Sequence, residues 1–272
     1  MATNRMVIID VDDVIASKAK GKKFPKWVVN FIKKFIHQDF LNEYFRRGDL
    51  GVDFCDGALE YLGDTFEVVG EENIPSEGRF CFVANHPLGG ADALKLISFC
   101  CHKYDSHVVT PANDILMSLK QLSEILVPVN KLGGQSRDLP ALLDEAFNSD
   151  KQVCLFPAGL CSRKIDGIVQ DLPWKKTFIT KSRASGRDII PIWFSGRNSW
   201  RFYFIERLCK KLKFKTNYAQ FFLPDELYRN RNEHYKMVIG KPIPSSTFTA
   251  DRKDAEWAAE VRKAVYELGK NN

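Results

Sequence analysis

The segment FVANHPLGGADAL, residues 82–94, places a histidine and an aspartate on either side of a Gly-Gly pair. His86 and Asp92 are six residues apart. On one helix, six steps of about 100° would point their side chains to different faces, so a turn is needed to bring them together. A carboxylate bonded to one imidazole nitrogen leaves the other nitrogen free to accept a proton, which is the arrangement of a general base. The same two residues also fit a histidine that only stabilises its loop.

The flanking residues predict which elements would position this pair. The run RFCFVAN before His86 has the pattern of a buried strand, and DALKLISFC after the Gly-Gly pair has that of a helix. Further short apolar runs alternate with amphipathic segments along the chain, namely SHVVTPA, EILVPVN, QVCLFPAG and DIIPIWFSG. This alternation predicts an α/β fold with a largely parallel sheet flanked by helices. His86 would then lie at the C-terminal end of a strand, where sites form in such sheets.

The N-terminal region is rich in lysine. Seven lysines, from Lys18 to Lys34, precede the next acidic residue, Asp39. Residues 25–37, PKWVVNFIKKFIH, predict a basic amphipathic helix with Trp27 and two phenylalanines on its apolar side. Such a helix suits an interfacial membrane anchor, and it also suits a helix packed on the core.

Composition and length indicate an ordinary globular chain, with 272 residues of which 44% are apolar and 27% charged. We expect a basic N-terminal helical accessory segment over 1–75, a core over 76–245, and a C-terminal helix over 246–272 that Asp251 would cap. The seven cysteines include no CxxC pair, which indicates a reducing, cytosolic setting. No apolar run reaches the roughly 18 residues of a spanning helix, so any membrane contact is expected to be peripheral.

Two other functions stay open on the residues alone. Residues 6–17, MVIIDVDDVIAS, resemble the nucleophile motif of haloacid-dehalogenase-like phosphatases, which implies that Asp10 attacks phosphorus while Asp12 acts as acid and base beside magnesium. No later Asp-Asp pair follows an apolar strand, as that fold needs. The other alternative is a non-catalytic module that uses the N-terminal lysines and the run RLCKKLKFK, residues 207–215, to bind a membrane or nucleic acid.

Several blocks in register resemble one enzyme superfamily. NHPLGGAD is similar to the first motif of the glycerolipid and lysophospholipid acyltransferases (1-acylglycerol-3-phosphate acyltransferase-like), in which four residues separate the histidine from the aspartate; here five intervene. FPAGLCSRK, residues 156–164, corresponds to the later block FPEGxRS, and the proline-containing strands LVPVN and IIPIWFSG recur in order. Together with DLPWKKTFI, residues 171–179, these sequence blocks resemble the bacterial hemolysin-like branch of the superfamily. That branch is associated with O-acylation of amino-acid lyso-lipids such as lyso-ornithine or lyso-glycine lipids.

This resemblance implies an O-acyltransferase that moves a fatty acyl chain from a thioester to the hydroxyl of a lyso-lipid. His86 would be the general base and Asp92 would orient its ring, while amides around Gly89 and Gly159 would face the oxyanion. Ala158 stands where the wider family has a glutamate, which implies an acceptor other than a glycerol phosphate. The substrate-binding residues implied by the matched blocks are Asn85, Gly89, Gly90, Asn130, Lys131, Pro157, Gly159, Ser162, Arg163 and Lys164.

The resemblance also implies the partners. An acyl carrier protein or coenzyme A thioester would donate the acyl chain, and no metal or other cofactor would be needed. The enzyme would be cytoplasmic and peripheral on the inner face of the cytoplasmic membrane, which it would contact through residues 25–37. Nucleic acid is then not an expected partner.

Overall fold

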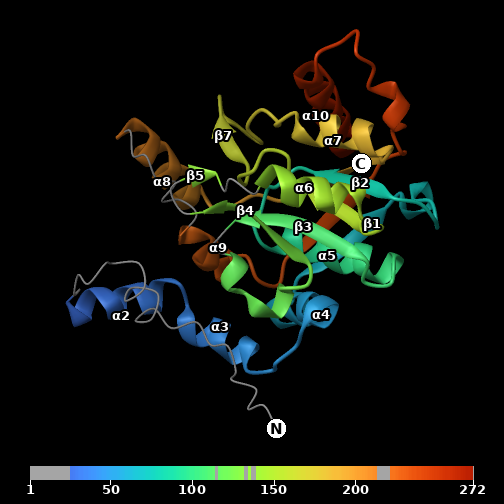
Figure 1. Cartoon of the computed structure of the whole chain (residues 1–272). Coiled ribbons are helices and arrows are strands. Elements are labelled where there is room, and N and C mark those ends of the chain that lie inside the picture. Colours follow the sequence, from blue (N-terminus) through green and yellow to red (C-terminus); the bar gives the residue numbers. More distant parts are fainter. Residues whose placement is uncertain (1–24, 114–115, 132–133, 136–138, 213–220, 272) are drawn as a thin grey trace.

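The structure is a computed structural model, and it describes residues 25–113, 116–131, 134–135, 139–212 and 221–271. The segment that contains Asp10 and Asp12, together with the lysines before residue 25, lies outside these residues. Figure 1 shows a central sheet with helices on both faces, and the first two described helices, α2 (Lys26–Phe35) and α3 (Gln38–Phe45), beside it at the lower left.

The sheet contains eight strands among the described residues. In their order across the sheet they are β1 (Thr65–Val69), β10 (His234–Ile239), β9 (Asp188–Phe194), β2 (Phe80–Ala84), β6 (Gln152–Leu155), β3 (Val108–Asn113), β4 (Leu126–Lys131) and β5 (Gly134–Gln135). The five strands from β9 to β4 run parallel to their neighbours. β10 is antiparallel to β9 and parallel to β1, and β5 is antiparallel to β4. The predicted α/β fold with a largely parallel sheet is therefore confirmed.

Two helical layers cover the sheet. One face carries α4 (Gly51–Leu62) and α5 (Ala91–Lys103); the other carries α6 (Leu139–Asn148), α7 (Thr177–Ser185) and α10 (Asp254–Lys270). Strand β2 is buried along its whole length, as expected for a strand covered on both faces. Its residues alternate between the two layers: Phe82 packs in the cluster that includes α4 and α5, and Val83 in the cluster that includes α6, α7 and α10.

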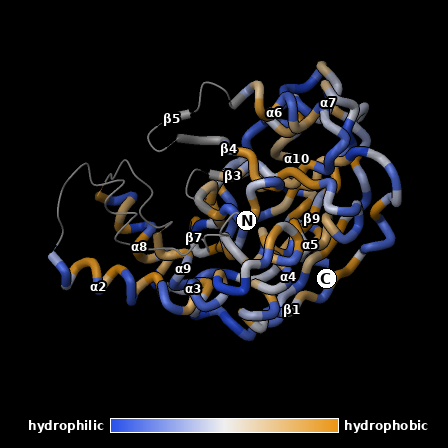
Figure 2. The backbone as a smooth tube through the Cα atoms, turned by 60° about the horizontal axis from the view of Figure 1, so that its bottom comes forward, coloured by the Kyte–Doolittle hydropathy of each residue, from blue (hydrophilic) through white to orange (hydrophobic). Residues whose placement is uncertain are grey.

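The first helices lie beside this core. α2 (Lys26–Phe35) and α3 (Gln38–Phe45) follow each other, and Figure 2 shows α2 extending away from the body with apolar residues along it. No residue of α2 is buried, and its Trp27 side chain is 73% exposed. The helix predicted over residues 25–37 is thus present, with Pro25 at its N-cap rather than in its first turn.

The last turn of α2 is anchored on α9 (Leu223–Arg229), which follows α8 (Trp200–Lys211). The Phe35 ring packs edge-on against Phe222 at a centroid distance of 4.8 Å. His37 stacks on Tyr228, and its Nε2 lies 2.8 Å from the Asp225 carboxylate.

The C-terminal helix begins later than predicted. Its N-cap is Lys253, and Asp254 is in the first turn, so the prediction that Asp251 caps the helix was wrong. The physical reason is that the Asp251 carboxylate accepts a hydrogen bond from the Thr249 hydroxyl, whereas Asp254 accepts hydrogen bonds from Arg183 and Thr180 on α7. The helix is therefore positioned by its contact with α7.

Short elements complete the described chain. A hairpin separate from the main sheet consists of β7 (Arg163–Ile165) and β8 (Ile168–Gln170). Single 3-10 turns occur at Glu71–Asn73, Leu116–Ser118, Lys120–Leu122 and Ser245–Thr247. Within the residues that the structure describes, no helix is long and apolar enough to cross a membrane.

The cysteines are all unpaired. Six of them are buried, and Cys209 on α8 is partly exposed. Burial raises the pKa of the Cys81 thiol to about 12 and also raises that of Cys161.

Candidate active site

A tight loop at the end of β2 brings His86 and Asp92 together. The strand ends at Ala84, and Asp92 lies in the first turn of α5. Nδ1 of His86 is 3.1 Å from Oδ2 of Asp92. Gly89 has a φ of 80°, in the left-handed region that glycine tolerates, and this turn accommodates the fifth intervening residue.

Asp92 is fully buried and densely hydrogen bonded. Its Oδ2 accepts the backbone N–H groups of Leu88 at 2.9 Å and Gly89 at 3.3 Å, and Oδ1 accepts that of Ala93 at 2.9 Å. Burial alone would raise the pKa of this carboxyl, but His86 and the backbone donors outweigh burial and lower it. Asp92 is therefore held as a carboxylate at the N-terminus of a helix, where negative charge is favoured.

The His86 ring is held from two directions. One face stacks on Phe156, with a centroid distance of 4.0 Å, and the side chain is 16% exposed. Burial lowers the pKa of His86, but the charge and hydrogen bond of Asp92, with a further contribution from Asp171, outweigh burial and raise it. With Nδ1 facing the carboxylate, Nε2 is the nitrogen that can accept a proton from a substrate.

Asp171 is a second buried carboxylate at this loop. Its Oδ1 accepts the backbone N–H of His86 at 3.2 Å and the Ser162 hydroxyl at 2.6 Å, and its Oδ2 accepts the Trp174 indole N–H at 2.9 Å. The loop that carries Asp171 is in turn held by α10, because Tyr266 accepts the Asp171 N–H at 2.7 Å. Burial raises the pKa of Asp171 despite these donors.

The block FPAGLCSRK lies next to the His86 loop. It follows β6, which is the parallel neighbour of β2, and the Ser162 N–H donates to the His86 carbonyl at 2.7 Å. Asn130 and Lys131 end strand β4 at the same edge of the sheet. The three matched blocks thus all end on the carboxyl side of the parallel strands, with β3 between β6 and β4.

The remaining residues implied by the resemblance differ in how much they face solvent. Asn85 is buried, and its amide pairs with the backbone N–H and C=O of Phe194. Ser162 is buried and donates to Asp171. Pro157 is buried, while Gly159 and Lys164 are exposed.

Arg163 is buried and already partnered. Its Nη1 donates to the Cys161 carbonyl at 2.6 Å, its Nε lies 3.4 Å from the Glu206 carboxylate, and its guanidinium lies over the Phe202 ring. These contacts attach the β7 hairpin to α8.

The amides expected to face an oxyanion have partners within the protein. Gly89 donates its N–H to Asp92, and Gly159 donates its N–H to the Phe156 carbonyl at 2.9 Å. Gly90 packs under α9, where a Cβ atom would approach a methyl group of Leu227 at 3.1 Å.

Three residues near the site were not assigned from the sequence. Asp171 belongs to the noted run DLPWKKTFI, but its role depends on a contact with a loop 85 residues away in the chain. Phe156 opens the FPAG block, and its stacking on His86 has no sequence signal. Lys175 places its ammonium group 3.0 Å from where a Cβ of Gly159 would be, so it is an exposed cation directly over that turn.

Ala158 belongs to the apolar core. It is buried in the cluster that contains Trp174, Phe178 and Ile179. A carboxylate at this position would point into that cluster.

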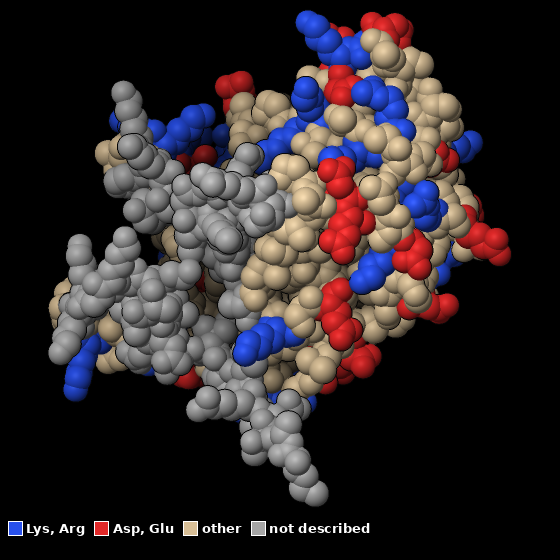
Figure 3. All heavy atoms as spheres, viewed as in Figure 1, with Lys and Arg blue, Asp and Glu red and all other residues tan. Residues whose placement is uncertain are grey.

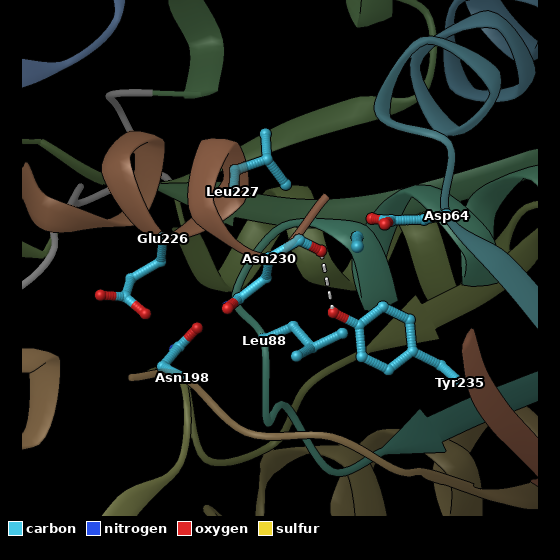
Figure 4. Close-up of a pocket in the computed structure, with 8 residues that line it drawn as sticks. Asp64, Leu88, Asn198, Glu226, Leu227, Asn230 and Tyr235 are labelled. Atoms are coloured by element: carbon cyan, nitrogen blue, oxygen red, sulfur yellow. Dashed lines mark hydrogen bonds between the residues drawn. The ribbon is translucent and has the colours of Figure 1, made fainter. Parts of the chain in front are cut away.

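A small cavity lies beside the loop and is too small for a substrate. It is lined by Leu88 from the loop and by Asn198, Glu226, Asn230 and Tyr235, which Figure 4 shows around Leu88. Its volume is about 10 Å³, the space of roughly one water molecule. Among the described residues, the amide nitrogen and oxygen of Asn198 find no hydrogen-bond partner.

A buried His–Asp pair on an α/β sheet, with Nδ1 of the histidine facing the carboxylate, is an arrangement suited to general-base chemistry. The chain belongs to the acyltransferase family, because the family model described as "Acyltransferase" matches residues 13–272. This confirms the predicted superfamily and enzyme class and decides against the two alternatives drawn from the residues alone.

Two curated relatives match almost the whole chain. The chain is 43% identical over 272 residues to the lyso-glycine lipid O-acyltransferase of Bacteroides thetaiotaomicron, covering 98% of this chain and all of that one. It is 42% identical to the enzyme of the same name from Phocaeicola vulgatus, with 98% of each chain covered. These matches support the predicted bacterial branch.

The fold is also found in a solved structure. The 1-acyl-sn-glycerophosphate (LPA) acyltransferase PlsC from Thermotoga maritima superimposes with a TM-score of 0.52 at 17% identity, over 95% of this chain and 88% of that one. At this identity the similarity concerns the fold.

Proposed function

We propose that this enzyme transfers a fatty acyl chain from an acyl thioester to the hydroxyl of a lyso-glycine lipid. The observation that carries the acceptor is the 43% identity, along the full length, to an enzyme of that name. The buried His86–Asp92 pair supports the same chemistry, because a lipid hydroxyl must lose its proton as it attacks.

In the proposed mechanism Nε2 of His86 takes the proton of the acceptor hydroxyl as its oxygen attacks the thioester carbon. Asp92 keeps the Nδ1–H oriented and stabilises the imidazolium that forms. The tetrahedral intermediate then collapses, the carbon–sulfur bond breaks, and the leaving thiolate takes the proton back from Nε2. The products are the ester and a free thiol, and His86 returns to its neutral form.

The acceptor headgroup needs a cation that is not already paired. Arg163 is buried against Glu206, and Ser162 donates to Asp171, so neither presents a free donor on the surface. Lys175, over the Gly159 turn, and Lys164, at the start of the β7 hairpin, are exposed. We assign the carboxylate of the glycine headgroup to Lys175, with Lys164 as the second cation.

The enzyme is proposed to work at the cytoplasmic face of a membrane. α2 supports this, since Trp27 and Phe31 are exposed on a helix that also carries Lys26 and Lys34. Acyl carrier protein and coenzyme A thioesters both suit the mechanism as donors, because only the thioester carbon takes part in it.

The test is acyl transfer from a labelled thioester to a panel of lyso-glycine, lyso-ornithine and lysophosphatidate acceptors, with each donor in turn. Transfer to lyso-glycine lipid is expected to dominate. His86→Ala and Asp92→Asn should each lower the rate by roughly 10²- to 10⁴-fold while the circular dichroism spectrum stays that of the wild type. Preferred transfer to lysophosphatidate would refute the acceptor, and full activity of His86→Ala would refute the mechanism.

A further inference from the structure

Helix α8 presents an apolar stripe to solvent. Trp200 and Phe204 are 75% and 58% exposed, and Leu208 and Leu212 continue the stripe at the same spacing of four residues. Residues four apart lie on one side of a helix. The two aromatic rings touch edge to face, with their centroids 6.3 Å apart. Large exposed apolar side chains gathered on one helix indicate a binding surface.

The other side of α8 is firmly attached, so the exposed stripe belongs to a well-positioned helix. Phe202 and Tyr203 are buried in a cluster with Cys161. Ser199 caps the helix by accepting the N–H of Phe202, and its hydroxyl donates to Glu226 on α9 at 2.6 Å.

Positive charge flanks the stripe. Arg207, Lys210 and Lys211 are exposed on α8, and Arg197 is exposed just before it. The acidic residue within α8, Glu206, is directed to Arg163. Basic side chains are visible at the upper left of Figure 3, where Figure 1 shows α8. Aromatic and aliphatic groups beside exposed cations match the acyl boundary and anionic headgroups of a bilayer.

α8 and α2 both pack on α9, and α9 in turn covers the His86 loop. α9 receives Phe35 of α2 through the neighbouring Phe222, and it receives Ser199 of α8 through Glu226. On its other side, Leu223 packs so closely over Gly89 that a Cβ there would be 2.9 Å away. Figures 1 and 2 both show α2 and α8 projecting on the same side of the molecule.

We propose that α8 is a second interfacial helix, which binds an anionic phospholipid bilayer together with α2 and holds the His86 loop next to the surface. The inference rests on the proposed function in one respect, namely that the acceptor is a membrane lipid. Two helices packed on α9 would restrict the orientation of the enzyme on the bilayer more than one helix would.

The test is flotation of the full chain with vesicles of phosphatidylcholine alone or mixed with phosphatidylglycerol, without donor or acceptor. The double variant Trp200→Ser/Phe204→Ser should bind the mixed vesicles about tenfold more weakly or worse. The matched control is Leu50→Ser, which replaces a side chain that is 63% exposed before α4. This control should bind like the wild type.

The charge component has its own variant. Arg207→Gln/Lys210→Gln/Lys211→Gln should lose about fivefold in affinity per residue on the mixed vesicles and keep its binding to phosphatidylcholine alone. High salt should reproduce the loss in the wild type, because it screens exposed charges.

Two results would overturn the inference. One is wild-type binding of mixed vesicles by the Trp200→Ser/Phe204→Ser variant. The other is a concentration-dependent dimer in sedimentation velocity that this variant abolishes, since a second copy would then cover the stripe. Activity on lyso-glycine lipid in detergent micelles separates this inference from the proposed function: loss of vesicle binding should leave micelle activity unchanged, whereas a wrong acceptor would leave even the wild type inactive in micelles.

Discussion

His86 lies between two carboxylates that hold different parts of it. Asp92 contacts the ring at Nδ1, and Asp171 accepts the backbone N–H. Burial favours the neutral ring, but both negative charges favour the protonated ring and prevail. A base with a raised pKa takes a hydroxyl proton more readily, yet it is blocked by protonation over a wider acid range.

The first prediction concerns the pH dependence of kcat/KM. The neutral ring is the active form in the proposed mechanism and its pKa is raised, so activity should fall as the pH drops through a midpoint above 6.5, the ordinary value for histidine. A pH profile with a saturating thioester donor measures this midpoint. A midpoint below the ordinary value would mean that burial dominates.

The second prediction isolates Asp171 as a positioning residue. Asp171→Asn removes a negative charge that raises the pKa of His86, so the acid limb should move to lower pH. Trp174→Phe is the control, because it removes a hydrogen-bond donor to Asp171 but no charge. If both variants lose stability while the acid limb stays in place, Asp171 only supports the fold.

At the scale of elements, the turn between His86 and Asp92 is enclosed by a helix distant in sequence. α9 covers Gly89 with Leu223 and Gly90 with Leu227, and Asp225 of α9 contacts His37 at the junction between α2 and α3. The turn therefore needs glycine for two reasons: the left-handed backbone at Gly89, and the absence of space for a side chain.

The third prediction tests this enclosure. Gly89→Ala should lower kcat, because its Cβ would overlap Leu223 and the backbone strain of about 1–2 kcal/mol would displace the loop. Gly167→Ala in the β7–β8 turn is the matched control, since it has a similar φ of 85° and open space around it. The control should lose stability of the same order and keep kcat; equal loss of kcat in both would assign the effect to general destabilisation.

At the scale of the whole molecule, the edge of the sheet opposite the site is held by one buried cation. Arg187, just before β9, donates to the carbonyls of Phe147 and Lys151 at 2.7 Å, of Ser149 at 2.5 Å and of Phe80 at 3.3 Å. Burial lowers its pKa to about 10, so it remains charged at neutral pH.

The fourth prediction tests whether the sheet edge at Arg187 contributes to stability independently of the edge that carries His86. Arg187→Leu would leave these carbonyls without their donor, which should cost about 2–4 kcal/mol of the free energy of unfolding. Thermal denaturation measures that loss. The kcat of the folded fraction should stay at the wild-type value, and a fall in kcat would show that the two edges are coupled.

Local patterns were sufficient for the five parallel strands from β9 to β4, the amphipathic helix α2 and the turn between His86 and Asp92, because apolar periodicity and the Gly-Gly pair are local signals. Long-range contacts were not predictable in this way. β1 pairs with β10 from the other end of the chain, and Asp171 reaches the His86 loop only in the fold. The burial of Arg163 against Glu206 likewise depends on how α8 packs on the hairpin.

The uneven burial of the thiols should allow one cysteine to be labelled selectively. Cys209 on α8 is partly exposed, while the other six cysteines are buried and cannot meet a polar reagent without unfolding. A maleimide dye should therefore attach to the native chain at this one position, with no cysteine needing to be removed first. The wild-type sequence thus carries one selective labelling site for a fluorescent reporter, on the helix proposed to meet the bilayer.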